Sequence, residues 1–406
     1  MRHLRRPRRP GRRPAILLAA VALVALAIPA VADAKTKGKG GQKVTVMTRN
    51  VFLGADLGPA LEAADIPSAI DGAGEIWNEF QSTNFPERAV PLAREIKESK
   101  ADLVGLQEVA TWFKQTPSDG GAPPISPIAT STPATDVEQD FLALLEQELK
   151  NVGAKYKVVN VQEEFSGELP VDADQNNATG TGPLASFGAD FDARLLMHDV
   201  ILAKKGSKVK LGKTTASHYT TRFEPNISGI EVPVDRGWVS VEAKVKGKSG
   251  KKGKKKTKTS KFRFVDTHLE AFGDPTIREA QAKELIAGPL NTNKQVILVG
   301  DLNSGLPDPH NVGVPGVGAG DPNDSLAFRA FRDAGFKDNG AVHTCCYPNL
   351  FDGSLVFDHT VDHVLTRPGL KTKKAFVTGN DAAERTPSGL WPSDHGGLVV
   401  RLQLKK

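Results

Sequence analysis

The sequence is poor in cysteine. Only two cysteines occur in 406 residues, and they are adjacent, at Cys345 and Cys346. Adjacent cysteines cannot cross-link distant segments, which excludes a disulfide-rich scaffold, and no further cysteine is present to complete a zinc site of the usual spacing. The pair can form a vicinal disulfide or remain as two thiols, and the sequence leaves both alternatives open.

Long apolar runs are also scarce, and the one that approaches membrane-spanning length lies at residues 15–32. An arginine-rich segment at 1–14 precedes it, and residues 32–34 (Ala-Asp-Ala) fit a small-x-small cleavage pattern. A retained membrane anchor is the alternative, but Pro29 and the cleavage pattern favour a signal peptide over residues 1–34. We therefore expect a secreted, extracellular protein.

The mature chain lacks an excess of either charge. The leader holds seven arginines and Asp33, so of 53 basic and 47 acidic residues, 46 of each remain. Ten lysines and no acidic residue fall within 244–261, which leaves the rest of the mature chain with a net charge of −10. An acidic remainder is typical of a protein that gathers carboxylates around a cation.

Strand-like and helix-like segments extend along the whole mature chain. Residues 35–43 predict a flexible linker and 44–404 a single domain, with 244–261 as a lysine-rich loop insertion. The Pro, Ser and Thr-rich segment 114–135 predicts an exposed loop. Hydrophobic patterns predict strands at 44–50, 101–109, 199–205, 237–245, 261–269, 296–300, 361–366 and 396–404, and helices at 87–99, 136–150 (with Asp136 as N-cap), 277–287 and 325–334.

Polar side chains follow six of these strands. In VILVGDLNS at 296–304, Asp301 and Asn303 come directly after a short buried strand, and they point to the same side if the extended conformation continues. An ordinary strand-to-loop turn is the alternative for this stretch alone. Six such endings together predict a shared rim of carboxylates, amides and histidines, which suits Mg2+ or Mn2+ bound partly through water.

The six polar segments resemble, in order, motifs of the endonuclease/exonuclease/phosphatase superfamily, which includes deoxyribonuclease-like nucleases and neutral sphingomyelinases. The resemblance implies an α/β fold, a two-sheet β-sandwich flanked by helices on both outer faces (four-layer α/β/β/α, deoxyribonuclease-like), with the site at one edge. The segments are TRN at 48–50, GLQEV at 105–109, DTHLE at 266–270, GDLNS at 300–304, VDHVL at 361–365 and SDHGG at 393–397.

The resemblance also implies which residues bind metal. Glu108 matches the principal ligand, with Asn50 beside it. Asp394 matches an additional acid that is sometimes a second metal ligand, so one or two ions remain possible. Glu108 has an alternative as an ordinary surface carboxylate that follows a strand.

Catalytic roles are implied in the same way. His395 matches the histidine beside the attacking water or scissile phosphate, and Asp362 the acid that orients it. Asp301 and Asn303 match the pair that positions the nucleophile and phosphate, and His268 a phosphate-contacting histidine. Both histidines could instead be structural, and the general base stays open.

Substrate contacts are the least specific part of the pattern. Arg194 and Asp199 are candidates to reach the phosphate. Lys254 and Lys255, in the lysine-rich segment, are candidates to contact a polyanion, either nucleic acid or an anionic membrane surface. The alternative is a solvated hairpin tip.

These features predict a secreted hydrolase, a metal-dependent phosphodiesterase whose leading candidate substrate is nucleic acid. A sphingomyelinase-like enzyme acting on a phospholipid headgroup is the alternative within the same chemistry. The alternative of another class is a non-catalytic polyanion-binding or surface-binding protein on the same scaffold. Each motif position, from Glu108 to His395, holds a chemically competent residue, which favours the enzyme. No obligate protein partner is inferred.

Overall fold

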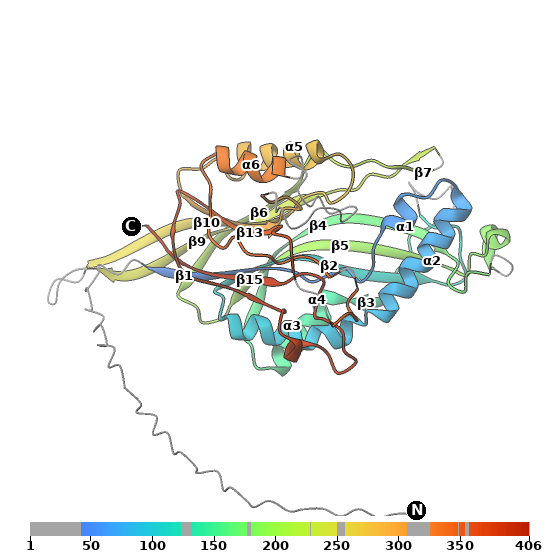
Figure 1. The fold of residues 1–406 in the computed structure, drawn as a ribbon, viewed down its shortest axis with the longest axis horizontal. Coiled ribbons are helices and arrows are strands. Elements are labelled where there is room, and N and C mark those ends of the chain that lie inside the picture. The colour runs from blue at the N-terminus through green and yellow to red at the C-terminus, as the bar shows by residue number, and fades with distance from the viewer. Residues whose placement is uncertain are drawn as a thin grey trace, which may run out of the picture. The chain divides into compact units, whose positions relative to one another are not determined.

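Two β-sheets stacked face to face, with helices on both outer faces, form the described part of the chain (Figure 1). The described residues belong to one compact unit. The predicted leader at 1–34, Lys254 and Lys255 lie outside them, as does most of the predicted linker at 35–43, whose last residue begins the first strand. The computed structural model describes residues 42–122, 131–176, 180–227, 229–249, 256–306, 325–347, 349–353 and 357–405.

The first sheet has seven strands in the order β14-β15-β1-β2-β5-β4, with β3 paired to β2. Strands β1 and β2 are parallel neighbours, and their register places Asn50 opposite Gln107. The strands are β1 (Lys43–Asn50), β2 (Leu103–Gln115), β3 (Asp136–Asp140), β4 (Tyr156–Val171), β5 (Phe191–Lys204), β14 (Lys371–Thr378) and β15 (Gly397–Gln403).

The second sheet has six strands in the order β12-β13-β11-β10-β9-β6. Here β10 and β11 are parallel, and β11 and β13 are antiparallel. The strands are β6 (Val209–His218), β9 (Gly237–Ser249), β10 (Lys256–His268), β11 (Gln295–Asp301), β12 (Lys337–Asp338) and β13 (Asp362–Arg367), and β7 (Asn226–Ile227) and β8 (Ile230–Glu231) pair separately.

Helices cover each sheet on the side away from the other. Phe80 and Leu92 pack on the first sheet, and Phe328 packs on the second. Between the sheets, Val46 and Leu103 belong to the same buried cluster as Phe264. The predicted four-layer architecture is confirmed. The helices are α1 (Gly58–Leu61), α2 (Ile66–Ser82), α3 (Phe85–Ser99) and α4 (Phe141–Asn151) by the first sheet, and α5 (Pro275–Ala287) and α6 (Leu326–Asp333) by the second.

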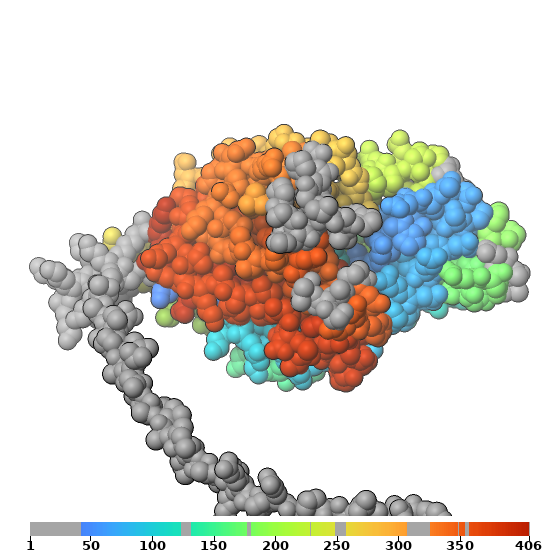
Figure 2. Space-filling model, viewed as in Figure 1, coloured from blue at the N-terminus to red at the C-terminus, as the bar shows by residue number. Residues whose placement is uncertain are grey.

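Figure 2 shows one face of this unit, on which the C-terminal segments, orange to red, lie next to the segment containing α1 and α2, in blue. Segments far apart in sequence therefore meet on this face. Among the described residues, no helix combines the length and the apolar character needed to cross a membrane.

The expected helix at 136–150 is only partly correct. Residues Asp136–Asp140 pair with β2 as strand β3, and the helix begins at Phe141. Its N-cap is Asp140, whose side chain accepts a hydrogen bond from the Ala143 N–H, so Asp136 is not the cap. The cause is tertiary, because β3 adds to the free edge at the end of β2.

Several further elements were not expected from sequence, among them helix α2 and strand β4. Helix α2 contains Gly72 and Gly74, which lower helix propensity, yet both lie where a Cβ would collide with backbone of another segment. Strand β4 is long and charged, and two bulges interrupt its alternation along β5. Both elements depend on contacts that are distant in sequence.

Candidate active site

Three predicted catalytic residues lie in one row across the second sheet. The register pairs His268, the last residue of β10, with Asp301, the last of β11, and pairs Asp301 with Asp362, the first of β13. Neighbouring strands lie about 4.8 Å apart, so the register alone brings the three side chains together. All three are buried, and Oδ2 of Asp301 lies 3.6 Å from Nε2 of His268.

Glu108 reaches the same place from the first sheet through a break in strand β2. Val104 and Leu106 face the helices, and strict alternation would send Glu108 to that side as well. The pairing with β5 shifts between Leu106 and Val109, and Glu108 takes φ = 58°. A positive φ in a residue other than glycine is strained and is often retained at functional sites. The bulge aims the carboxylate at the end of β1.

Asn50 joins the two sheets at this point. Its Nδ2 donates to Oε1 of Glu108 at 2.8 Å and to Oδ2 of Asp301 at 3.1 Å. The second oxygen of Glu108 accepts from the Leu53 N–H at 2.8 Å. Glu108 retains 15% side-chain exposure, whereas Asp301 retains 1%. Glu108 is therefore the more solvent-accessible of these two carboxylates.

His395 completes the cluster from the loop before β15. Its Nδ1 lies 2.9 Å from Oδ2 of Asp362, and its Nε2 lies 3.6 Å from Oδ2 of Asp301. Arg49 donates a hydrogen bond to the backbone carbonyl of His395 and pairs with Glu95 at 3.0 Å. These contacts orient the imidazole with Nδ1 toward one carboxylate and Nε2 toward the other.

His268 is fixed in one tautomer by a residue that sequence reasoning missed. Arg236 places a guanidinium nitrogen 3.0 Å from Nδ1 of His268, and arginine can only donate. Nδ1 therefore accepts, and a neutral ring carries its proton on Nε2, facing Asp301 and Glu108. With that proton present, the 3.1 Å contact between Nε2 and Asn303 Nδ2 joins two donors and is not a hydrogen bond.

Asn303 reaches the site by a turn, contrary to the expected continuous strand. Strand β11 ends at Asp301, and Asn303 has φ = 43°. Its N–H donates to Oδ1 of Asp301 at 2.9 Å, and its side chain donates to the carbonyl of Leu269 at 2.9 Å. Asp301 and Asn303 still meet beside His268, but through an Asx-type turn.

Asp394 lies in the loop that carries His395, and its Oδ1 accepts from the Ser393 hydroxyl at 3.1 Å. The fully buried Arg88 donates to the carbonyls of Val51 at 2.8 Å and Pro392 at 3.0 Å. It thereby ties the loop after β1 to the loop before β15. Burial lowers the pKa of Arg88 to about 9, so it stays a cation at neutral pH and offsets part of the negative charge of Asp394.

Three carboxyl groups of the site, those of Asp301, Glu108 and Asp394, have raised pKa values. Burial raises the pKa of Asp301 to about 6, with the charge of Asp362 adding to the effect and His395 opposing it. Burial and then Asp394 raise the pKa of Glu108, and burial raises that of Asp394. The carboxylates of this cluster therefore carry more negative charge than the protein's own cations neutralise there.

The two histidines shift in opposite directions. Burial lowers the pKa of His395, but the carboxylates of Asp362, Asp394 and Asp301 outweigh it and raise that pKa well above the usual value. Burial, the cation of Arg236 and His395 all lower the pKa of His268. At neutral pH, His395 is a cation and His268 a neutral donor through Nε2.

The donor set fits a hard divalent cation. Glu108, His268 and Asp301 offer ligand atoms within 4.8 Å of one another, as do Asp301, Asp362 and His395. Oδ1 of Asp362 is buried and has no hydrogen-bond partner among the described residues. Carboxylate and amide oxygens are the ligands that Mg2+ and Mn2+ prefer, and a cation here would relieve the repulsion that raises the carboxylate pKa values.

Of the two further candidates for phosphate contact, Arg194 is not brought to the cluster, whereas Asp199 lies beside it. Arg194 donates to the Ala134 carbonyl, lies over the Phe113 ring and faces Glu168 at 3.9 Å. It is five residues along β5 from Asp199, roughly 17 Å at the usual strand rise. Asp199 is fully buried, where burial raises its pKa well above the usual value. The charges of Asp301 and Glu108 add to that rise, so Asp199 is buried next to the cluster, and Arg194 is the candidate that lies away from it.

The lysine-rich segment lies at the far end of the second sheet. Strands β9 and β10 pair as a hairpin with Lys244 opposite Lys261, so residues 244–249 and 256–261 belong to strands and the loop insertion expected over 244–261 is too long. Lys256 begins β10 and His268 ends it, so roughly 40 Å separates the lysine-rich end from the site. Lys254 and Lys255 themselves lie outside the described residues.

The chain matches the model of the Endonuclease/Exonuclease/phosphatase family over residues 74–395. Among solved structures it is similar to a protein of that family from Bacteroides thetaiotaomicron, with a TM-score of 0.48 and 14% identity over 90% of this chain and 99% of that chain. A mannosyl-6-phosphatase from the same organism has a TM-score of 0.45 and 14% identity, covering 88% of this chain and 99% of that chain. Truncated TDP2 from Caenorhabditis elegans has a TM-score of 0.43 and 18% identity, covering 90% and 99%. No curated protein gives a significant match.

Proposed function

The chain belongs to the endonuclease/exonuclease/phosphatase family of phosphoester-hydrolysing enzymes, and from this premise we propose that it is a divalent-metal-dependent phosphodiesterase that cleaves nucleic acid. The arginine-rich leader and cleavage pattern at 1–34 support export, so we propose that the enzyme acts outside the cell.

One observation carries the chemical part of the proposal. His395 is held by Asp362 at 2.9 Å, and its Nε2 faces Asp301 at 3.6 Å, beside Glu108 and His268. An oriented histidine cation, a carboxylate with a pKa about 6 and a neutral histidine donor are thus gathered at the end of the sandwich. Phosphoester hydrolysis needs such groups to align water and to stabilise charge on the phosphate oxygens.

The roles follow from the protonation states. Asp301 has a pKa near neutrality, which suits it to orient the attacking water and accept its proton. His395, a cation kept in place by Asp362, donates to a phosphate oxygen as negative charge develops there. His268 donates its Nε2–H to a second phosphate oxygen or to the leaving oxygen. A magnesium or manganese ion held by Glu108, with Asn50 and Asp394 beside it, would neutralise charge on the phosphate.

Nucleic acid as the substrate is supported by the surface of the β9–β10 hairpin. Lys244, Lys246, Lys258 and Lys261 are exposed on its arms. Lys261 and Lys258 precede His268 by seven and ten residues on β10, roughly 23 and 33 Å at the usual strand rise, so these lysines cannot touch the scissile phosphate and act only on a substrate long enough to reach both places. A polyanion is such a substrate, and its attraction is long-ranged at low salt.

A phospholipid headgroup is the second candidate. Leu306, five residues after Asp301, is 57% exposed, and Phe351 is 49% exposed. The loop of Phe351 lies near the site, since the carbonyl of Asp352 accepts from the ring N–H of Trp391. Exposed large apolar side chains of this kind can dock at a lipid interface.

The test is hydrolysis of plasmid DNA, sphingomyelin vesicles and a phosphomonoester in parallel, with Mg2+ and with chelator. The proposal expects metal-dependent cleavage of DNA and of a small chromogenic diester. Metal-dependent headgroup release without DNA cleavage would select the lipid candidate. Cleavage of the monoester alone would contradict a phosphodiesterase, and DNA binding without any turnover would support the non-catalytic alternative.

A further inference from the structure

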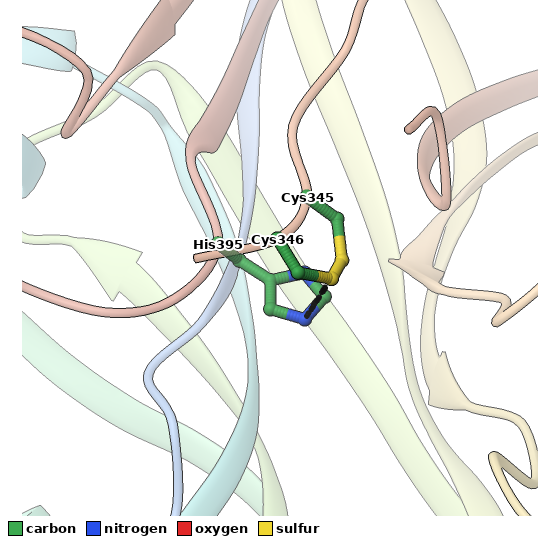
Figure 3. A group of neighbouring side chains, drawn as sticks. All are labelled: Cys345, Cys346 and His395. Carbon is green, nitrogen blue, oxygen red and sulfur yellow. Dashed lines mark hydrogen bonds between the residues drawn. A yellow bond between two sulfur atoms is a disulfide. The ribbon is translucent and has the colours of Figure 1, made fainter. Parts of the chain in front are cut away.

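Two sulfur atoms lie against the imidazole of His395 (Figure 3). Sγ of Cys345 is 3.7 Å and Sγ of Cys346 is 3.9 Å from Nε2, and the two cysteines are joined as a disulfide. The same Nε2 atom faces Asp301 at 3.6 Å. Neither cysteine has a role in the hydrolysis proposed above, so the contact with His395 requires another explanation.

The backbone keeps this arrangement independently of the bond between the sulfurs. The Tyr347 N–H donates to the carbonyl of Asp394 at 2.9 Å, and the Gly396 N–H donates to the carbonyl of Thr344 at 2.6 Å. The residues before and after the cysteine pair are thus bonded to the residues after and before His395. Reduction of the disulfide breaks none of these bonds.

We propose that Cys345, Cys346 and His395 form a second metal site, for a thiophilic cation such as Zn2+, which becomes available when the disulfide is reduced. Their donor atoms lie within 4.8 Å of one another. Zinc binds thiolate at about 2.3 Å and imidazole at about 2.0 Å, so tetrahedral geometry separates sulfur from nitrogen by about 3.5 Å. The observed separations of 3.7 and 3.9 Å are close to that requirement.

The site differs in character from the carboxylate cluster beside it. Two thiolates and an imidazole select zinc and other soft cations, whereas carboxylate and amide oxygens select magnesium or manganese. Water would supply the fourth donor. The chain therefore carries a soft site and a hard site that share His395.

Reduction of the disulfide requires a dithiol reductant. The disulfide accepts two electrons and two protons, which cleaves the sulfur–sulfur bond and leaves two thiols, while the reductant closes to its own disulfide. Binding of Zn2+ then releases three protons to solvent, the two thiol protons and the Nε2 proton of the His395 cation, and the metal occupies Nε2. An oxidised pair offers no thiolate, so the cation is excluded from this site.

Occupation of the site would stop turnover, a consequence that depends on the function proposed above. Zinc on Nε2 takes away the atom that stabilises the phosphate. The disulfide form would thus be the active, zinc-resistant form, and the reduced form would be inhibited by zinc.

The binding test uses the mature protein, with Co2+ as a coloured substitute for zinc. Reduced protein should bind one Co2+ with a sulfur-to-cobalt charge-transfer band, and reoxidation should remove the band. Cys345→Ser/Cys346→Ser should show none, the single variant Cys346→Ser should show a weaker one, and His395→Asn should bind at least about tenfold more weakly. His218→Gln, in β6 and away from the site, is the matched control and should bind like wild type.

Absence of the band in reduced wild type, or its persistence in the double variant, would overturn the site. A separate arm measures inhibition of DNA hydrolysis by Zn2+, which should act on reduced protein at concentrations at least about tenfold lower than on oxidised protein. Equal inhibition of both forms would overturn the inhibitory role. A cobalt band in a protein that hydrolyses nothing would leave the metal site standing and contradict the proposed function instead.

Discussion

Nδ1 of His395 lies 2.9 Å from Oδ2 of Asp362. The two residues are 33 positions apart, with His395 in the loop before β15 and Asp362 at the start of β13. The pair is buried, and Nε2 of His395 faces Asp301 and the two cysteine sulfurs. A second buried pair, His363 with Asp338 at 3.2 Å, has the same residue types, but His363 Nε2 faces the backbone carbonyl of Ser304. Nε2 of His395 therefore faces the carboxylate cluster, whereas Nε2 of His363 is used in a backbone contact.

Asp362→Asn should lower kcat for DNA hydrolysis by roughly 10² to 10⁴-fold, because the asparagine removes the charge that orients His395 and stabilises its protonated form. Asp338→Asn is the matched control, and it should affect stability while changing kcat less than about threefold. Steady-state kinetics together with thermal unfolding of both variants makes the comparison. Equal losses of kcat in the two variants would contradict the assignment of His395.

Glu108→Gln should raise the Mg2+ concentration needed for half-maximal activity by at least about tenfold, because one anionic oxygen ligand becomes a neutral amide. The amide oxygen can still accept from Leu53, so the fold should be retained. A magnesium titration of the rate measures the effect. An unchanged half-maximal concentration would show that Glu108 does not hold the cation.

Part of this site follows from sequence patterns, and part does not. Short apolar strands ending in Asp301, His268 and Asn50 predict a shared rim, because parallel neighbours bring their carboxyl ends together. The bulge that turns Glu108 inward has no local pattern, since it depends on the pairing of β2 with β5. The turn at Asn303 likewise replaces the extended strand that alternation suggested.

The positioning arginines could not be found from sequence, because their role is defined by distant backbone. Arg88 lies in α3 and bonds the carbonyls of Val51 and Pro392, which are 341 positions apart. Arg236 reaches His268 across the paired strands of the second sheet. In each case the partners are fixed by tertiary structure.

Gly105→Ala should destabilise the protein by about 1 to 3 kcal/mol. A Cβ at this position would lie 2.3 Å from Oδ1 of Asp266 and 2.7 Å from Cγ2 of Val299, which belong to the other sheet. Gly212→Ala, also in a strand, is the control, since its nearest neighbours would be at an ordinary 3.4 Å. Urea unfolding of both variants tests whether the sheets approach this closely, and equal stabilities would contradict it.

We expect the free energy of unfolding to fall as the pH rises from 4.5 to 7, because of the carboxyl group of Glu168. Burial raises its pKa from 4.5 to about 7, with the charge of Asp192 adding to the effect. The folded state therefore binds more protons than the unfolded state in this window, and its advantage is lost as the pH passes the folded pKa. Relative to Glu168→Gln, wild type should lose on the order of 2 kcal/mol across the window. Parallel stability profiles for the two proteins in urea titrations would refute the assignment.

Lys244→Gln/Lys258→Gln should raise KM for DNA severalfold at low salt and leave hydrolysis of a small chromogenic diester unchanged, because these exposed lysines act only on a long polyanion. Lys371→Gln/Lys373→Gln removes the same charge from exposed positions of β14 in the other sheet and is the control. If both double variants behave alike over a range of salt concentrations, the hairpin has no specific part in binding DNA.

Metal-dependent phosphodiester hydrolysis should require His395, which is tested by comparing plasmid cleavage by wild type and His395→Ala with Mg2+. We expect cleavage by wild type that chelator abolishes, and a loss of at least about 10²-fold in the variant with its circular dichroism unchanged. Cleavage by a folded His395→Ala at the wild-type rate would contradict the requirement for His395.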